Sequence, residues 1–430
     1  MSYDTTRDSE QLRVIDPSID DFIERYNSSS GLADGSRQTV FLFPGGMACK
    51  LKRATAPYVD GVSTPQTFAY DTAWLEPDML VWPDDVPDLQ MTKVASGKYR
   101  DKNDRIIVAD GAIGYLGCTP YLGFTIWCEL KGLDYFVFGW DWRRRIEHSG
   151  RFFVEKFLPY FQARVKDGCN NADPLANFSL IGHSAGGMVV NWILRKNDAN
   201  VANMRLAITV ATPFYGYAGQ VHRWFEGQPP FNGLLNVFRK KIIKTICSFP
   251  GCYAWMFLDE QTYADNQAAL AADPEYPLVA YPSTDKTTKG TIADPYDPQK
   301  NGALSRYPAA GATGFDAAEL VHAKTLVQYL ASDLDPALAA KFFNIRGDTT
   351  ADDTAGSTTW DWVPPTDPSP IADGAGVPGD GTQPAWTARH VGLAAAFPSH
   401  VITVKGADVE HTFTMSSPTT LDALAGVLGV

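Results

Sequence analysis

One serine lies in a local pattern that is typical of a reactive hydroxyl. Residues 182–186 read Gly-His-Ser-Ala-Gly, a match to G-x-S-x-G, between the apolar run "FSLIG" and the helical pattern "AGGMVVNWILRKN". A strand that turns abruptly into a helix holds its serine in a strained conformation and needs small neighbours. It also presents Oγ at a helix N-terminus, which favours developing negative charge. The pattern predicts Ser184 as a nucleophile; the alternative is a structural Gly-Ser turn.

A serine hydroxyl becomes nucleophilic when a base removes its proton and a carboxylate orients that base. On a strand–serine–helix site the partners follow in the order Ser, Asp or Glu, His. We predict His411 as the base because "VITVKGADVEHTFTM" places it in the loop beyond the last predicted strand. His183 is excluded because adjacent side chains in a turn diverge. Other late histidines fit less well by position: His322 in a predicted helix, His390 before a helical stretch and His400 at the entry to the last strand.

Two groups of aspartates could orient the imidazole. Asp348, Asp352 and Asp353 directly follow a predicted strand, and that position favours them. Asp380 lies in "GVPGDGTQPAW", where a tight Gly-Asp-Gly turn favours it instead. The residue pattern alone leaves this choice open.

The negative charge that develops on a substrate carbonyl oxygen requires two backbone N–H donors. The residue after the nucleophile, Ala185, supplies one of them. The second comes from the loop after an early strand, and "FLFPGGMACKL" offers two glycines there, which let the backbone approach a substrate closely. We predict Gly46 N–H as this donor, with a plain glycine turn as the alternative.

The elements that position these residues can be read from short apolar, β-branched runs. Runs without polar alternation are typical of strands buried on both faces of a mainly parallel sheet. Helical spacing of apolar residues occurs between and after them, which predicts an α/β fold with right-handed crossovers. The predicted strands are 39–44, 135–140, 178–182, 206–212, 342–347 and 400–406, and the predicted helices include 152–168, 185–197 and 419–429.

Long stretches interrupt this alternation. We predict a core built from residues 39–51, 134–212 and 341–430, cap or lid insertions at 52–133 and 213–340, and an N-terminal extension at 1–38. The second insertion is dense in aromatic residues, which would either grip a lipid-like substrate or fill a satellite core. Residues 348–385, rich in Thr, Asp, Pro and Gly, are predicted as a long loop.

Composition excludes several classes of function. A net charge of −12 over 430 residues argues against nucleic acid and anionic membrane surfaces as partners. No apolar run reaches the roughly 20 residues of an integral membrane segment. The polar, acidic start contains no secretory signal, so we expect a cytoplasmic protein. The oligomeric state is not indicated.

The six cysteines contain no CxxC pair, and we expect reduced thiols, with Cys247 and Cys252 as the pair near enough to form a disulfide. No HExxH motif occurs and the histidines are scattered. We therefore expect neither a metal nor another cofactor.

With these residues placed, the chain resembles the lecithin:cholesterol acyltransferase family, which includes lysosomal phospholipases. The resemblance covers about residues 39–425 and rests on several motifs in the same order. They are Pro44-Gly45-Gly46 running to Leu51, Trp140-Asp141-Trp142-Arg143, the serine turn, Ala211-Thr212-Pro213-Phe214-Tyr215-Gly216, Trp255-Met256-Phe257, Thr366-Asp367-Pro368, Gly379-Asp380-Gly381-Thr382 and Glu410-His411-Thr412-Phe413-Thr414-Met415.

The resemblance implies an α/β-hydrolase fold with a mainly parallel sheet, flanking helices and cap insertions. It implies Asp380 as the orienting carboxylate, with Asp348 as runner-up, and oxyanion donors at Gly46 and Ala185. Asp141 and its neighbouring arginines would form a structural ion-pair cluster.

The sequence also departs from the family. Ala48 stands where the family has a glycine, and residues 50–117 contain no cysteine, whereas members that act on lipoproteins close a lid there with a disulfide. These departures indicate a microbial-type soluble relative.

We therefore expect a serine ester hydrolase that acts on a small hydrophobic ester, such as a lipid, a phospholipid or a bulky lactone, through an acyl-enzyme on Ser184. One alternative is acyl transfer to an alcohol from the same acyl-enzyme. The other is a non-catalytic ligand-binding protein on this fold, although such proteins usually lose one member of the triad.

Overall fold

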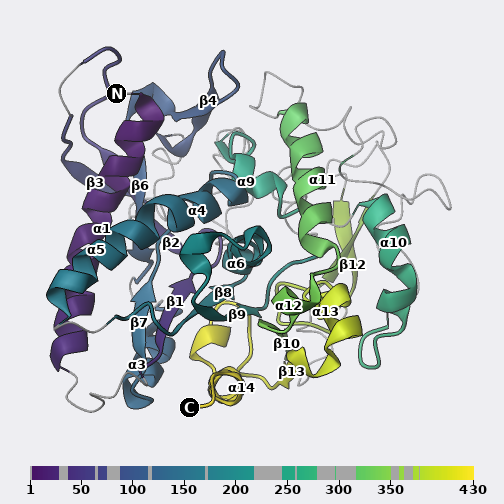
Figure 1. The fold of residues 1–430 in the computed structure, drawn as a ribbon. Helices are drawn as coiled ribbons and strands as arrows, with labels where there is room; N and C mark the ends of the chain where they lie inside the picture. The colour runs from purple at the N-terminus through teal and green to yellow at the C-terminus, as the bar shows by residue number, and fades with distance from the viewer. Residues whose placement is uncertain are drawn as a thin grey trace.

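Six parallel strands form the central sheet, in the order β13-β10-β9-β8-β1-β7 (Figure 1). The computed structural model describes residues 2–28, 37–62, 66–74, 88–114, 119–169, 173–216, 245–256, 259–277, 296, 316–349, 358–362, 371–376 and 378–430. Each strand of this sheet lies where the sequence predicts one. The strands are β1 (Thr39–Phe43), β7 (Asp134–Val137), β8 (Phe178–His183), β9 (Met204–Val210), β10 (Phe342–Asp348) and β13 (Val401–Lys405).

Strands β1 and β8 are neighbours and are buried along their whole length. Their mainly apolar sequences suit this position because helices cover both faces of the sheet. In a parallel sheet the carboxyl ends of all strands meet at one edge. The loop after β1 and the turn after β8 are therefore side by side.

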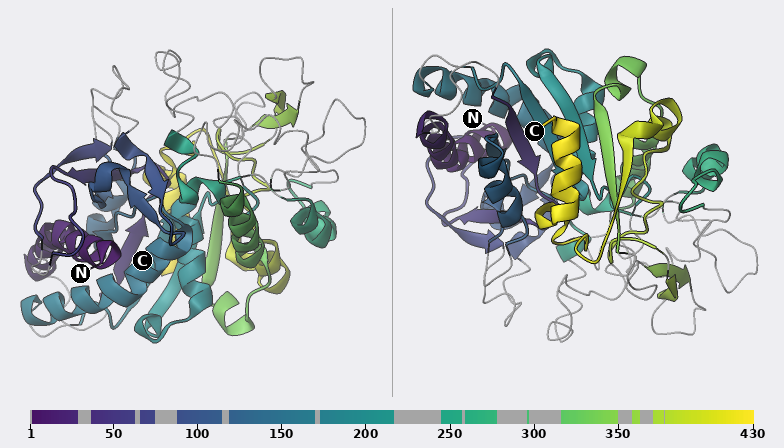
Figure 2. Two further views of the ribbon diagram at one scale, coloured as in Figure 1. Left: turned by 90° about the horizontal axis from the view of Figure 1, so that it is seen from above. Right: turned by 90° about the horizontal axis from the view of Figure 1, so that it is seen from below.

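One face of the sheet is covered by α3 (Leu122–Leu130) and α14 (Pro418–Leu428). The right-hand view of Figure 2 shows α14, in yellow, lying across the strands. Helix α14 begins after Ser417, whose Oγ accepts the Thr420 N–H at 3.2 Å, and it ends at Leu428, before Gly429 in the left-handed conformation. These start and stop signals agree with the helix predicted for residues 419–429.

The other face is covered by a larger group of helices, which enclose the main core. Aromatic rings dominate it: Phe41 and Phe43 of β1 both contact Phe153, with ring centroids 5.6 and 4.8 Å apart in edge-to-face geometry. The helices include α1 (Tyr3–Ser28), α4 (Ile146–Phe152), the π-helical turn Phe153–Phe157, α5 (Leu158–Gly168), α6 (Ala185–Lys196) and α11 (Ala317–Ala331).

Smaller elements surround these layers. They are the antiparallel sheet β3-β2-β6, from β2 (Cys49–Ala54), β3 (Tyr70–Trp74) and β6 (Ile107–Ala112), the pair β4 (Met91–Lys93) and β5 (Tyr99–Asp101), the pair β11 (Thr358–Trp362) and β12 (Ile371–Gly376), and the helices α9 (Pro250–Tyr253), α10 (Glu260–Ala271), α12 (Pro336–Ala339) and α13 (Val391–Ala396).

The proposed division into core, extension and caps stays a prediction. Much of 213–340 (217–244, 257–258, 278–295 and 297–315) lies outside the described residues, as do Asp352, Asp353, Cys118 and Thr366-Asp367-Pro368. Helix α1, from the predicted extension, packs on β6, β7 and α5. Helix α3 belongs to the predicted insertion 52–133, yet it packs on strand β7 of the central sheet.

A buried ion cluster lies behind the sheet around Asp141, where the family resemblance implies one. Asp141 Oδ2 lies 2.7 Å from Arg143, 3.2 Å from Arg144 and 3.3 Å from Arg7. Asp101 also bridges Arg143 and Arg144. Burial by itself would raise the pKa of Asp141, but the guanidinium of Arg143, followed by those of Arg144 and Arg7, holds that pKa below its usual range.

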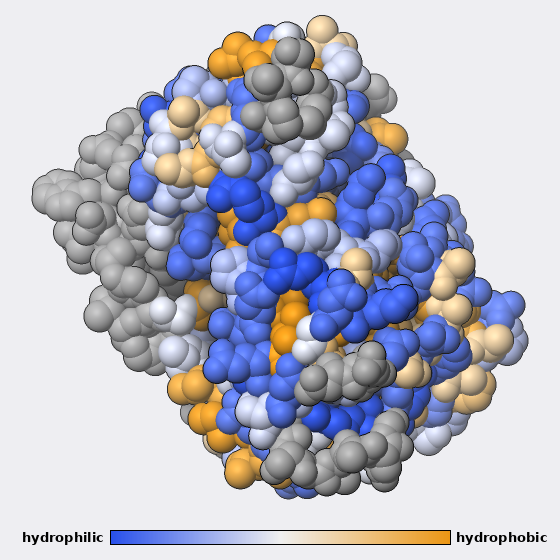
Figure 3. Space-filling model, turned by 60° about the vertical axis from the view of Figure 1, so that its left-hand side comes forward, coloured by the Kyte–Doolittle hydropathy of each residue, from blue (hydrophilic) through white to orange (hydrophobic). Residues whose placement is uncertain are grey.

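Hydrophilic side chains predominate on the face shown in Figure 3, where apolar residues form small separate groups. Among the described helices, none combines the length and apolar character needed to cross a bilayer. Cys247 and Cys252 are both buried thiols rather than a disulfide. Together, the parallel sheet, its two helical layers and the serine turn after β8 form an α/β-hydrolase fold.

Candidate active site

Ser184 lies in the turn between β8 and α6 with φ 52° and ψ −129°, a conformation that L-residues rarely adopt. The turn is tight because its glycines touch neighbouring backbone. A Cβ on Gly182 would lie 2.4 Å from Gly187 Cα, and one on Gly186 would lie 2.2 Å from the carbonyl oxygen of Phe43. The small residues of the motif are therefore required by packing, and the strain holds Oγ at the edge of the sheet.

The structure brings His411 to Ser184. His411 Nε2 lies 3.0 Å from Ser184 Oγ, and His411 Nδ1 lies 2.7 Å from Asp380 Oδ2. The His411 side chain is 12% exposed and that of Asp380 is 2% exposed, so a substrate can reach the imidazole while the carboxylate is shielded from water. The hydroxyl, imidazole and carboxylate thus stand in hydrogen-bonding order at the carboxyl edge of the sheet.

Backbone groups orient the Asp380 carboxylate. Its Oδ1 accepts the N–H of Thr382 at 3.0 Å and the N–H of Gln383 at 2.7 Å. Gly381, with φ 84°, permits the tight turn that brings these two donors back onto the side chain. The other carboxylate oxygen, Oδ2, faces His411.

The runner-up carboxylate, Asp348, has different partners. It ends β10, and its Oδ2 accepts a hydrogen bond from the Tyr276 hydroxyl. Asp380 packs against the end of β10: a Cβ added to Gly347 would lie only 3.2 Å from Asp380 Cβ. Of the aspartates considered from the sequence and described here, Asp380 is the one brought to His411.

The two predicted oxyanion donors belong to segments that adjoin Ser184. Helix α6 begins at Ala185, so the Ala185 N–H is one of the first-turn donors that no intrahelical bond uses. The loop of residues 44–47 lies directly against the nucleophile, since a Cβ on Gly45 would be 3.1 Å from Ser184 Cβ. Within the described residues, no hydrogen bond uses the Gly46 N–H.

His183 is buried beside this group. Burial holds the pKa of its imidazole well below the usual value, and the nearby His411 lowers it further. Its Nδ1 lies 2.9 Å from the Tyr121 hydroxyl. His183 is therefore a neutral neighbour of the catalytic candidates.

The remaining candidate histidines lie elsewhere. His322 Nε2 is 2.6 Å from Glu147 Oε1. His390 caps α13, with Nδ1 accepting the Leu393 N–H at 3.1 Å. His400 Nδ1 is 3.0 Å from the carbonyl oxygen of Phe342.

Two aromatic residues contact the loop of residues 44–47, and neither was among the site residues predicted from the sequence. Tyr121 Oη accepts the Gly45 N–H at 2.7 Å, although sequence spacing gives no sign that Tyr121 reaches this loop. Trp255, part of the "WMF" segment, lies over Gly46, where a Cβ would be 2.5 Å from the indole ring.

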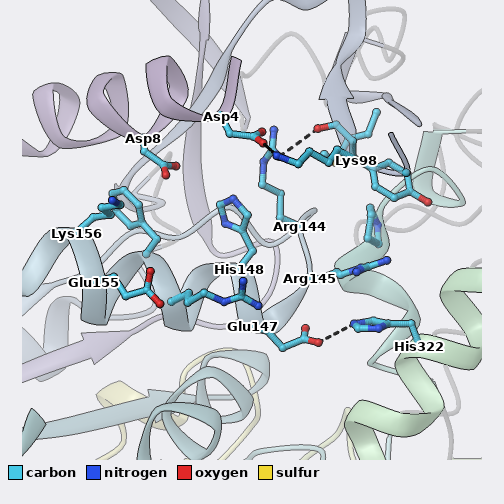
Figure 4. A pocket seen from close by; sticks show the side chains of 16 residues that line it. Asp4, Asp8, Lys98, Arg144, Arg145, Glu147, His148, Glu155, Lys156 and His322 are labelled. Atoms are coloured by element: carbon cyan, nitrogen blue, oxygen red, sulfur yellow. Dashed lines mark hydrogen bonds and ion pairs between the residues drawn. The ribbon is translucent and has the colours of Figure 1, made fainter. Parts of the chain in front are cut away.

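A hollow of about 420 Å³ lies between α1, α4, α11 and the turn from β4 to β5 (Figure 4). Acidic and basic side chains line it together: Lys98 pairs with Asp4 at 2.5 Å and His322 with Glu147 at 2.6 Å. Its lining residues are separate from the group around Ser184. Across the described parts of the chain, no three His, Cys, Asp or Glu side chains cluster as metal ligands.

No protein-family model matches the chain, and no curated protein matches its sequence. The fold is similar to that of a chain in the crystal structure of the Tle4–Tli4 complex, with a TM-score of 0.50 and 12% sequence identity over 92% of this chain and 99% of that one. At such identity this likeness concerns the fold alone. Weaker matches are a carboxylesterase structure from Nitrososphaera gargenis (TM-score 0.29, 11% identity, 93% and 92% covered) and a probable hydrolytic enzyme from Pseudomonas aeruginosa (TM-score 0.25, 12% identity, 92% and 86% covered).

Proposed function

We propose that this chain is a serine hydrolase that cleaves a carboxylic ester, with Ser184 as nucleophile, His411 as general base and Asp380 as the orienting carboxylate. The observation that carries the proposal is the pair of contacts made by one imidazole, 3.0 Å to Ser184 Oγ and 2.7 Å to Asp380 Oδ2. This is the arrangement that activates a hydroxyl in acyl transfer.

In the proposed reaction, Ser184 Oγ attacks the ester carbonyl carbon while its proton passes to His411 Nε2. The carbonyl oxygen becomes an oxyanion and accepts hydrogen bonds from Gly46 N–H and Ala185 N–H; one such donor is typically worth about 2.7–4 kcal/mol. The bond to the alcohol oxygen then breaks, and the alcohol leaves with the proton from His411. Water, deprotonated by the same imidazole, cleaves the acyl-enzyme to the acid and restores the serine.

Asp380 acts through His411. It accepts the Nδ1–H and thereby keeps the imidazole in the tautomer whose Nε2 can take a proton. Its negative charge also stabilises the imidazolium that forms during each transfer. Because the backbone N–H groups of Thr382 and Gln383 hold the carboxylate in place, it needs no reorganisation during the reaction.

The proposed substrate is a small hydrophobic ester, such as a lipid, a phospholipid or a bulky lactone. Two features support an apolar substrate: the Trp255 ring against the 44–47 loop, and the aromatic-rich composition of the 213–340 stretch. We also propose kinship with the lecithin:cholesterol acyltransferase family, supported by the order of its motifs along the chain.

The test is a panel of p-nitrophenyl esters, phospholipids and macrolactones, measured with the native protein and with Ser184→Ala. We expect hydrolysis of at least one apolar ester, and a loss of kcat of roughly 10⁶ in the variant. Equal rates for both proteins would refute the proposal. Repeating the assay with added 1-butanol separates hydrolysis from acyl transfer, because transfer yields the butyl ester.

A further inference from the structure

Four aromatic side chains from separate parts of the chain hold the 44–47 loop. We call Trp74, Tyr121, Trp140 and Trp255 the aromatic collar. Trp140 Nε1 donates to the carbonyl oxygen of Pro44 at 2.8 Å, and Trp74 Nε1 donates to that of Met47 at 2.7 Å. Gly45 N–H donates to Tyr121 Oη at 2.7 Å, and the Trp255 ring packs on Gly46.

The loop needs such support because its backbone is strained. Met47 has φ 66°, in the left-handed region that favours glycine. A strained residue of this kind persists only when its surroundings fix it. The collar forms hydrogen bonds with the Pro44 carbonyl oxygen, the Gly45 N–H and the Met47 carbonyl oxygen, which flank Gly46. The Gly46 N–H is left for a substrate oxygen.

Tyr121 is the collar member that also reaches the serine turn. Its hydroxyl lies 2.9 Å from His183 Nδ1, and both side chains are buried, with 4% and 3% of their surface exposed. His183 directly precedes Ser184, so one hydroxyl group connects the loop that carries one oxyanion donor with the turn that carries the nucleophile and the other donor. The rings also contact each other edge to face, with centroids 5.7 Å apart.

We propose that Tyr121 is a positioning residue, whose hydroxyl sets the distance between Gly46 N–H and Ser184 and so pre-forms the oxyanion site. This inference rests on the proposed ester hydrolysis and deepens it. Tyr121 acts through Gly45 and His183 and does not itself contact the substrate. Displacing an oxyanion donor by a fraction of its hydrogen-bond length weakens binding in the transition state more than in the ground state.

The test uses Tyr121→Phe, which keeps the ring and removes the hydroxyl. The matched control is Tyr215→Phe, because Tyr215 is fully buried and its hydroxyl likewise accepts a backbone N–H, that of Val391 at 3.3 Å. Each protein is assayed with p-nitrophenyl butyrate and with its thiono analogue, in which sulfur replaces the carbonyl oxygen. A thiocarbonyl sulfur is a poor hydrogen-bond acceptor, so the ester-to-thionoester rate ratio reports on the oxyanion donors. Both rates come from one sample, so the ratio does not depend on how much of the protein is folded.

We expect Tyr121→Phe to lower kcat for the ester by roughly 10- to 100-fold, with little change in KM, and to lower the ester-to-thionoester ratio by a similar factor. Tyr215→Phe should leave the ratio as in the native protein. An unchanged ratio in Tyr121→Phe, with the native protein active, overturns the positioning role alone. A native protein inactive on this ester and on every other ester of the panel overturns the proposed function, and this inference with it; if another ester of the panel is the substrate, that ester and its thiono analogue replace the butyrate pair.

Discussion

His411 and Asp380 are joined at two points. The Nδ1 of His411 lies 2.7 Å from Asp380 Oδ2, and the backbone N–H of His411 donates to the carbonyl oxygen of Asp380 at 2.8 Å. The loop that carries the base is thus fastened to the turn that carries the carboxylate, independently of either side chain. Changes to the carboxylate should therefore alter the chemistry while leaving the loops in place.

Asp380→Asn should lower kcat by about 10⁴, because an amide stabilises the wrong imidazole tautomer and cannot stabilise the imidazolium. The backbone bond between the two residues remains, so the midpoint of urea unfolding should change little. Steady-state kinetics and urea unfolding measure the two effects. The matched control is Asp348→Asn, which removes the charge from the other candidate carboxylate and should retain native kcat. A larger loss from Asp348→Asn than from Asp380→Asn would reverse the assignment.

Gly186→Ala should destabilise the fold, because its Cβ would lie 2.2 Å from the carbonyl oxygen of Phe43 and α6 would have to shift away from β1. We expect a decrease of about 1–3 kcal/mol in the free energy of unfolding. Gly426→Ala is the control: it lies in α14 with nothing within 4 Å of the added Cβ, and it should stabilise the protein by about 0.5–1 kcal/mol. The free energy of unfolding of both variants is measured by chemical unfolding. Equal changes in Gly186→Ala and Gly426→Ala would contradict the steric conflict expected at Gly186.

Asp141→Asn should lower the free energy of unfolding by about 3–5 kcal/mol, because it removes the one carboxylate that Arg7, Arg143 and Arg144 share. Asp101 still pairs with Arg143 and Arg144, but the buried cluster is then left with excess positive charge. The control is Asp60→Asn, which breaks an exposed ion pair with Arg100 and should leave stability nearly unchanged. The measurement is urea unfolding at neutral pH. A small effect of Asp141→Asn would show that the cluster does not stabilise the fold.

His390 should make stability depend on pH. Burial, together with the nearby Arg195, lowers the pKa of His390 from 6.5 to about 3. Between these values the unfolded chain binds a proton that the folded chain does not, so stability falls as pH falls, by up to about 1.4 kcal/mol per pH unit. His390→Asn keeps an acceptor at the start of α13 and should reduce this slope. The free energy of unfolding of the native protein and of His390→Asn is measured at several pH values. The same dependence on pH in both proteins would contradict this role of His390.

The sequence allowed Ser184 and His411 to be paired because parallel strands end at one edge of the sheet. Residues that follow β8 and β13 must therefore approach each other, whatever their separation in the chain. The choice of carboxylate depended on a turn. The Gly-Asp-Gly sequence indicates a turn at Asp380, but it does not reveal that the N–H groups of Thr382 and Gln383 hold this carboxylate toward His411. Residue order alone could therefore not separate Asp380 from Asp348.

Other features depend on contacts between distant segments. The polar start of the chain forms α1, which buries Ile15, Ile19 and Phe22 and brings Arg7 to Asp141. Val14, Ile15, Ile19 and Phe22 recur at the three- and four-residue spacing of a helix, so the pattern does indicate this element, although the polar composition of the segment conceals it. The hydrogen bond between the Gly45 N–H and the Tyr121 hydroxyl cannot be predicted from the sequence, because it joins a backbone group and a side chain from separate elements.

Covalent labelling with a fluorophosphonate, followed by peptide mapping, tests directly whether Ser184 is an activated nucleophile. Attack by Ser184 Oγ on phosphorus displaces fluoride and leaves a stable phosphonyl ester on the serine. We expect one adduct on the peptide that contains Ser184, with labelling abolished in Ser184→Ala and strongly slowed in His411→Ala. A native protein that takes up no label at Ser184, or a His411→Ala variant labelled at the native rate, would contradict this role of Ser184.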